Sequence, residues 1–396
     1  MVFSLHVCHV WDRFWPIEIG GLERYILGLT SYLAKNKEYE FSLITGRSKL
    51  RFITKNIGKY EDAGFLKVYR LGPSPIDLVN GVVFSAFHST PPLVERAMLA
   101  DLYREAAKSE VARSADVFHI HGIWRDLEYI KLGIYLSRRF RKPLVLTLHG
   151  GFVGDPLQGG MPLESPAVRS ILENDVAQIT TYCREVLSTL ERMGLGYKSH
   201  LITNFVDTWR FTNHQTTRSQ RDVTVIYVSR FERVQTPELV IKAFKQATEQ
   251  VPNAKLLMVG YGTLYEKLEA LIKELNLEHA VSMLGRQTDV RKFLWNSDIF
   301  VATNFGYIAS LEAMSAGLAV VAPNFGILKE TIVDGETGML VEEHNVDQLA
   351  NALVSLIKDE EFRRKLAYNS QQSVKNYDIR EVAPKMAQVY ELAVKK

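Results

Sequence analysis

Short apolar runs alternate with longer amphipathic segments along almost the whole chain. Residues 3–10 form an apolar run typical of a buried strand, and residues 22–34 carry apolar side chains at helical spacing. The same alternation predicts strands at 41–45, 66–70, 117–121, 144–148, 178–182 and 199–203, with helices at 91–109, 126–140 and 184–193. Such alternation favours a parallel sheet with helices on both faces.

A polar segment without periodicity, residues 212–222, interrupts this pattern and is typical of a linker. The alternation then restarts and continues to a last helix at 379–394. We therefore expect an α/β protein with two doubly wound, Rossmann-like domains, whose ligands bind at the carboxyl ends of the strands in a cleft between the two halves. The expected boundaries are a first domain at 1–211, the linker at 212–222, a second domain at 223–378 and a C-terminal helix, 379–396, that packs back on the first domain.

Composition narrows the class of protein. A chain of 396 residues with 46% hydrophobic residues is ordinary for a soluble globular protein of two domains. The net charge of +3 does not by itself indicate nucleic acid, and no nucleic-acid partner is predicted. The two cysteines show no disulfide pattern, and the sequence has no signal-peptide pattern and no apolar run long enough to span a bilayer. These features favour a cytoplasmic location.

Two local clusters of basic residues leave a second possibility open for the location. They are Arg47, Lys49, Arg51, Lys55 and Lys59, and Arg138, Arg139, Arg141 and Lys142. A basic cluster is most often a solvated face. The alternative is contact with an anionic membrane surface or a lipid-linked acceptor, which would place the protein peripherally at the inner membrane face.

Several glycine-bearing loops follow predicted strands. Gly20 and Gly21 precede the first helix, where a backbone without side chains lets a phosphate approach the helix N-terminus, although a plain turn is the more common explanation. The segment 307–338 contains a short helix with Glu312, a buried strand, a loop at Gly326 and a glycine-rich turn. A helix N-terminus suits a diphosphate and a neighbouring carboxylate can bind ribose hydroxyls, although an ordinary strand–loop–helix unit has the same pattern.

Charged and polar side chains stand at other strand ends. Arg230 follows the strand at 223–228, where a guanidinium can clamp a pyrophosphate or pair with Glu232 on the surface. His149 is followed by two glycines and could contact a transferred sugar or an acceptor. His119 and His121 share one side of their strand, but without a third ligand no metal site is predicted. The turns at 260–262 and 285–286 could bind a nucleobase edge.

Taken together, the motifs resemble those of the retaining GT-B glycosyltransferases, in particular family four. The resemblance rests on GGLERY (20–25), ADVFHIHG (115–122), KPLVLTLHGG (142–151), ITNFVDTWRF (202–211), YVSRFERVQTPELVIKAF (227–244), LLMVGYGTLYEKLEAL (256–271), LGRQTDVRKFLWNSDIFVA (284–302) and the block 307–338. Their order and spacing carry the resemblance, since no single motif is specific.

The resemblance implies a hexosyltransferase-type enzyme that needs no bound metal or other cofactor and uses a nucleotide-diphosphate sugar as its donor substrate. The second domain would hold the donor and the first would hold a glycan, lipid-linked or small-molecule acceptor. The implied catalytic residues are His149, Arg230 and Asn304. The implied donor-binding residues are Gly20, Gly21, Arg230, Gln235, Gly260, Gly262, Arg286, Gly306, Ile308, Ala309 and Glu312.

Two departures from the family pattern keep an alternative open. The family usually pairs two glutamates eight positions apart, and the first position is here Asn304; a basic residue usually lies five positions after the arginine, and here it is Gln235. The first hypothesis is an active transferase. The alternative is a catalytically degenerate binding partner of an active glycosyltransferase, and a nucleotide-sugar epimerase ranks last because its acidic cleft residues are missing from the motifs. The sequence does not specify the donor, the acceptor or the oligomeric state.

Overall fold

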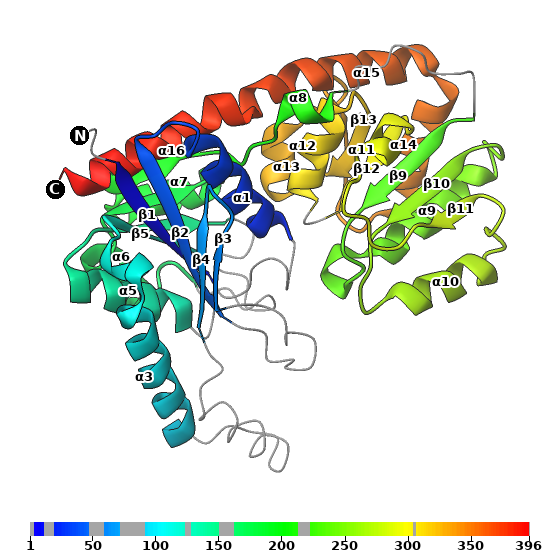
Figure 1. The fold of residues 1–396 in the computed structure, drawn as a ribbon. Helices are drawn as coiled ribbons and strands as arrows, with labels where there is room; N and C mark the ends of the chain where they lie inside the picture. The colour runs from blue at the N-terminus through cyan, green and yellow to red at the C-terminus, as the bar shows by residue number, and fades with distance from the viewer. Residues whose placement is uncertain are drawn as a thin grey trace. The chain divides into compact units, whose positions relative to one another are not determined.

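The computed structural model describes residues 4–11, 20–46, 59–71, 92–122, 128–149, 162–212, 222–303 and 306–395. The chain forms two compact units. Unit 1 comprises Met1–Thr203 together with Val382–Lys396, and unit 2 comprises Asn204–Glu381. Each unit is built on one twisted sheet with its own hydrophobic core (Figure 1).

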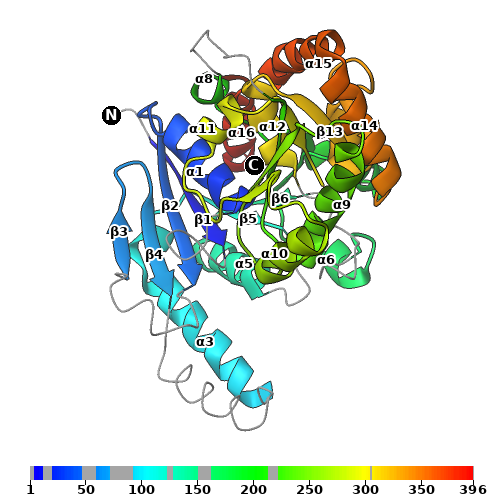
Figure 2. The same ribbon diagram turned by 90° about the vertical axis from the view of Figure 1, so that its right-hand side faces the viewer.

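Unit 1 contains an eight-stranded sheet in the order β3-β4-β2-β1-β5-β6-β7-β8. The strands are β1 (Leu5–Trp11), β2 (Tyr39–Gly46), β3 (Tyr60–Asp62), β4 (Lys67–Leu71), β5 (Val117–His121), β6 (Leu144–Leu148), β7 (Gln178–Thr181) and β8 (Ser199–Leu201). All neighbouring pairs are parallel except β3 with β4, and the edge from β3 to β1 can be followed in Figure 2. Every residue of β5 and β6 is buried, as expected for central strands of a parallel sheet covered on both faces.

The helices of unit 1 are α1 (Gly21–Leu33), α3 (Pro92–Lys108), α4 (Glu110–Arg113), α5 (Glu128–Phe140), α6 (Pro166–Asn174), α7 (Arg184–Arg192) and most of α16 (Ile379–Val394). Helix α16 packs on the sheet of unit 1 through buried side chains. Tyr390 contacts His119 of β5, and Tyr39 of β2 donates a hydrogen bond of 2.8 Å to Glu391.

Unit 2 contains a six-stranded parallel sheet in the order β11-β10-β9-β12-β13-β14. The strands are β9 (Thr224–Val228), β10 (Lys255–Val259), β11 (Val281–Met283), β12 (Ile299–Val301), β13 (Ala319–Pro323) and β14 (Met339–Val341). The helices are α8 (Thr208–Phe211), α9 (Pro237–Thr248), α10 (Tyr265–Glu274), α11 (Arg291–Trp295), α12 (Tyr307–Ser315), α13 (Gly326–Thr331), α14 (Val346–Lys358) and α15 (Glu360–Ser373).

The prediction of two doubly wound sheets is confirmed, and the differences are local. The sheet of unit 1 carries an antiparallel edge strand, β3, that the alternation did not indicate, because its three residues are too few to show a period. The expected loop at Gly326 is instead the start of α13. Most of the expected linker, residues 213–221, lies outside the described residues. Among the described helices, none has the length and apolar character needed to cross a bilayer.

Candidate functional site

The strand order of unit 2 creates a switch point between β9 and β12. The chain moves from β9 outward to β10 and β11 and then returns to the other side of β9 to form β12. Connections on the two sides of this point run in opposite directions, which leaves room at the carboxyl ends of β9 and β12 for a ligand. Arg230 follows β9, and the N-cap of α12, Gly306, follows β12, so these two predicted residues flank the switch point.

Gly260 and Gly262 let the loops after β9 and β10 lie against each other. Gly260 has a φ of +152°, and a Cβ there would be 1.8 Å from the Ser229 carbonyl oxygen; a Cβ at Gly262 would be 2.4 Å from the Phe231 carbonyl oxygen. The Phe231 amide donates to the Tyr261 carbonyl at 3.1 Å, which joins the two loops. Close backbone packing therefore explains both glycines, whether or not they also contact a nucleotide.

A buried hydrogen-bond network supports the loop before α12. The Tyr227 hydroxyl donates to the Gln235 carbonyl at 3.0 Å and lies 3.0 Å from the Thr303 hydroxyl. The Gly306 amide donates to the Thr303 carbonyl at 2.9 Å. The network thus connects the loop after β9 with the N-terminus of α12, so both sides of the switch point are held by the same interactions.

The predicted donor-binding residues of unit 2 differ in exposure. Arg230 and Arg286 are exposed at strand ends, while Ile308 and Ala309 in the first turn of α12 are half-buried. Glu312 lies in the second turn and is only 4% exposed. Gln235 is buried, and its side-chain oxygen has no hydrogen-bond partner within the described part of the chain. Asn304 lies outside the described residues.

In unit 1, an acidic side chain already lies at the N-terminus of α1, the helix that begins at Gly21. The Gly20 amide donates to Glu23 Oε2 at 2.6 Å, and the Trp11 indole donates to Glu23 Oε1 at 2.9 Å. This is only one half of a capping box, because Gly20 has no side chain that could accept from the Glu23 amide, and it was not predicted. A phosphate at this N-terminus would have to share the positive end of α1 with the Glu23 carboxylate.

His149, which is half-buried, adjoins a group of buried histidines at the switch point of the unit 1 sheet. His9 on β1 lies opposite His119 on β5 in the parallel register, and both point to the same face as His121. His9 Nδ1 is 3.0 Å from His121 Nε2, and His121 Nδ1 is 3.2 Å from His149 Nε2. Sequence analysis singled out His119, His121 and His149 but missed His9, because only strand pairing brings β1 beside β5.

His119 makes separate contacts on the same face. Its Nδ1 lies 2.9 Å from the Tyr390 hydroxyl, and its Nε2 lies 2.7 Å from the Thr147 hydroxyl, which in turn is 2.6 Å from the Thr180 hydroxyl. Both ring nitrogens of His119 therefore have partners. These contacts connect β5 to β6, β7 and α16.

Burial keeps these imidazoles neutral. Desolvation lowers the pKa of His9 and of His149 to about 3 and holds the pKa values of His119 and His121 well below the usual value. A neutral imidazole is a possible metal ligand, and His9, His119 and His121 place ligand atoms within 4.8 Å of one another. The structure thus supplies the third imidazole that the sequence did not reveal.

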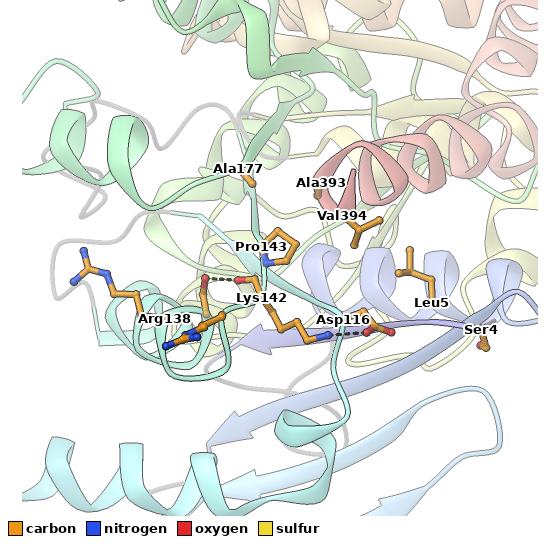
Figure 3. Close-up of a pocket in the computed structure, with 11 residues that line it drawn as sticks. Ser4, Leu5, Asp116, Arg138, Lys142, Pro143, Ala177, Ala393 and Val394 are labelled. Atoms are coloured by element: carbon orange, nitrogen blue, oxygen red, sulfur yellow. Dashed lines mark hydrogen bonds and ion pairs between the residues drawn. The ribbon is translucent and has the colours of Figure 1, made fainter. Parts of the chain in front are cut away.

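A pocket of about 820 Å³ in unit 1 lies away from these residues, at the amino ends of the strands (Figure 3). Leu5 at the start of β1, Asp116 before β5 and Pro143 before β6 line it, together with Ala393 and Val394 of α16. Ligands of doubly wound sheets bind at the opposite, carboxyl edge, so this pocket is not the expected site.

Ion pairs occupy part of the predicted basic clusters. Lys142 pairs with Asp116 at 3.0 Å, as Figure 3 shows, and Arg138 pairs with Asp175 at 2.6 Å. In the other cluster Lys59 pairs with Glu105 at 2.5 Å, and the remaining members lie outside the described residues. The described pairs favour the interpretation of a solvated face.

Comparison with known proteins gives matches over both halves of the chain. The family model described as Glycosyltransferase Family 4 matches residues 19–210, and the one described as Glycosyl transferases group 1 matches residues 210–373. An N-acetyl-alpha-D-glucosaminyl L-malate synthase of Bacillus anthracis is 28% identical over 69% of this chain and 74% of its own length. An uncharacterized glycosyltransferase of Methanocaldococcus jannaschii is 25% identical over 96% of each chain.

Two solved structures share the fold over nearly the full length. HepE of Anabaena in complex with UDP and glucose gives a TM-score of 0.74 at 16% identity, covering 98% of this chain and 100% of that one. Sucrose-phosphate synthase of Thermosynechococcus elongatus gives a TM-score of 0.74 at 19% identity, covering 98% of each chain. At such identities the likeness concerns the fold alone.

Proposed function

Because this chain belongs to the group 1 glycosyltransferases of the GT-B fold, we propose that it transfers a sugar from a nucleoside-diphosphate sugar to a hydroxyl acceptor and retains the anomeric configuration. The GT-B architecture predicted from the sequence is thereby confirmed. The observation that carries the proposal is the switch point of unit 2, where Arg230 and the N-terminus of α12 stand at the ends of adjacent strands.

The chemistry of this arrangement suits a diphosphate. The N-terminus of α12 offers backbone N–H groups and the positive end of a helix dipole, and Arg230 adds a permanent charge with a planar donor geometry. Glu312, one turn further along α12, would accept hydrogen bonds from ribose hydroxyls. The charge of the leaving nucleotide would be met by the guanidinium and the amides, so the proposed transfer does not depend on a metal ion.

Retention would follow a front-face course, in which the leaving phosphate oxygen assists the acceptor hydroxyl while the glycosidic bond to phosphate breaks. The protein then supplies orientation and charge stabilisation and no nucleophile. This requirement is compatible with Gln235 and Asn304 at positions where the family usually has charged residues. The α-linked product in the name of the Bacillus relative supports retention when the donor is α-linked.

The names of relatives suggest which donors and acceptors to test first. The Anabaena protein was captured with UDP-glucose, and the Bacillus relative is named for N-acetylglucosaminyl transfer. We therefore propose a UDP-sugar as the donor and a glycan, lipid-linked or small-molecule hydroxyl as the acceptor. A phosphatidyl-myo-inositol mannosyltransferase of Mycolicibacterium smegmatis, 27% identical over 42% of this chain, keeps lipid-linked acceptors in the set to be tested.

The first experiment is a thermal-shift screen of nucleoside diphosphates and their sugars. A ligand that binds only the native state at about 100 times its Kd stabilises it by ~2.7 kcal/mol, which raises Tm measurably. Positive donors are then tested for sugar transfer and for hydrolysis without acceptor. A panel without any binder would contradict the transferase and favour the degenerate binding partner.

The second experiment tests the residues. We expect Arg230→Ala and Glu312→Ala to abolish sugar transfer with little change in Tm. Glu312→Gln keeps the shape of the buried side chain and removes its charge, so it separates the effect of the charge on transfer from the effect of the shape. Arg364→Ala is the matched control, since Arg364 is an exposed arginine on α15 that pairs with its helix neighbour Glu360. Full activity in both alanine variants would remove this site assignment.

A further inference from the structure

A hydrogen-bonded row of imidazoles runs through the buried face of the unit 1 sheet and ends at His149. His9 is fully buried on β1, His121 is fully buried at the end of β5, and His149 directly follows β6. The two contacts that join them, His9 Nδ1 to His121 Nε2 and His121 Nδ1 to His149 Nε2, measure 3.0 and 3.2 Å. We call these three residues the imidazole chain.

The protons of the imidazole chain can be ordered in two ways. Each ring is neutral and carries a single N–H, so a ring that donates through one nitrogen must accept through the other. In the first order, His149 donates to His121 and His121 donates to His9. In the second order, His9 donates to His121 and His121 donates to His149.

The inner end of the chain distinguishes these two orders. His9 Nε2 is buried and has no hydrogen-bond partner within the described part of the chain. The first order would place an N–H on this nitrogen, and a buried N–H without an acceptor is rare in native structures. The second order leaves only a lone pair on this nitrogen, and a buried acceptor without a partner is less rare than a buried donor without one. The second order is therefore favoured.

We propose that His121 is a positioning residue that fixes the tautomer of His149, so that His149 accepts at Nε2 and presents its Nδ1–H to the substrate. This inference rests on the proposed transferase function. The imidazole chain makes His149 a neutral hydrogen-bond donor, suited to an acceptor such as a sugar hydroxyl oxygen or a phosphate oxygen. His149 would neither remove a proton from the acceptor nor supply a positive charge.

The surroundings of the chain restrict the alternatives. The ring of Tyr25 on α1 lies edge-on to both His121 and His149, which limits rotation of the two imidazoles. A metal ion held by His9, His119 and His121 would need a nitrogen of His119, and both of its nitrogens already contact hydroxyl groups. A metal would also take one nitrogen of His121, and both nitrogens of His121 are used in the imidazole chain, so metal binding and the intact chain exclude each other.

Histidine tautomers can be read directly in the whole protein without substrate. The experiment uses selective ¹⁵N-histidine labelling and long-range ¹H–¹⁵N correlation, with His149→Asn used to assign the signal. We expect a protonated Nδ1 and an unprotonated Nε2 at His149, at neutral pH. A protonated Nε2, or about one equivalent of zinc in the purified protein, would overturn the proposal.

Two variants of His121 test the positioning role. His121→Phe keeps an aromatic ring but removes the donor, and we expect a mixed tautomer at His149 with kcat lowered at least about tenfold and KM for the donor changed less than about threefold. His121→Asn places an amide N–H near the position of Nδ1, and we expect it to restore the tautomer and most of kcat. Equal kcat and equal tautomers in wild type and His121→Phe would refute the inference.

A control and a fallback keep the result interpretable. His119→Gln alters the neighbouring imidazole outside the chain, so it should leave the His149 signal unchanged even where it lowers Tm. When His121→Phe does not fold, the wild-type tautomer alone decides. A wild-type protein that shows the expected tautomer but transfers no sugar from any donor would refute the proposed function while leaving the tautomer assignment standing.

Discussion

Mild acid should destabilise unit 1 selectively, because three fully buried histidines stay neutral in the native state. His9, His119 and His121 are at most 1% exposed, and burial lowers their pKa values, that of His9 to about 3. In the unfolded chain each would titrate near its usual value of about 6.5. Between these two pKa values, unfolding takes up a proton at each site.

The sign and size follow from proton linkage. Since the unfolded state binds more protons below about pH 6.5, the free energy of unfolding falls as the pH falls, until the native pKa is reached. Going from about pH 7.5 to about pH 5.5 costs ~1.4 kcal/mol for each histidine that remains neutral in the native state, or ~4 kcal/mol for the three. This is a large part of the usual stability of a domain, about 5–15 kcal/mol.

The two cysteines provide a probe for this unit alone. Cys8 on β1 and Cys183 before α7 are both buried, neither is in a disulfide bond, and both are in unit 1. Pulse labelling in urea with a disulfide reagent that reacts at acidic pH, such as dithiodipyridine, therefore reports the unfolding of unit 1 even when unit 2 unfolds separately.

A variant isolates the contribution of one histidine from that of other titrating groups. His9→Gln should be less sensitive to acid than the wild type by ~1.4 kcal/mol over the same pH range, whatever its stability at neutral pH. An identical pH response in wild type and variant would show that His9 is protonated in the native state or does not titrate, and would refute the reasoning.

Three further changes should affect stability by known mechanisms. Gly260→Ala would force a Cβ against the Ser229 carbonyl and should sharply lower Tm and donor binding. Gly285 also has a positive φ, 62°, but open space around the position of a Cβ, so Gly285→Ala should lower the free energy of unfolding in a urea titration by only ~1–2 kcal/mol. Asp378→Ala removes a carboxylate that accepts from the Thr208 amide and hydroxyl and pairs with Arg380, so thermal melting should show a loss of ~1.5–3 kcal/mol. Tyr390→Phe leaves His119 Nδ1 without its partner and should cost ~1–3 kcal/mol by thiol labelling, with unchanged sugar transfer.

Periodicity alone determined much of this protein. Parallel strands buried on both faces must be apolar throughout, and their helices must be amphipathic, so the fold class and most elements could be predicted from residue pattern. Arg230, on one side of the switch point of unit 2, was also found in this way, since strand ends are visible in the sequence, whereas Gly306 on the other side was implied only by the family resemblance.

The tertiary structure decided the features that depend on contacts between segments distant in the sequence. His9 is more than a hundred positions from His121, and only the adjacency of β1 and β5 brings their nitrogens to 3.0 Å. Tyr390 meets His119 only because α16 packs on the sheet of unit 1. The order of the strands, and hence the position of the switch point, is likewise set by packing between segments distant in sequence, which leaves no period for local analysis to detect.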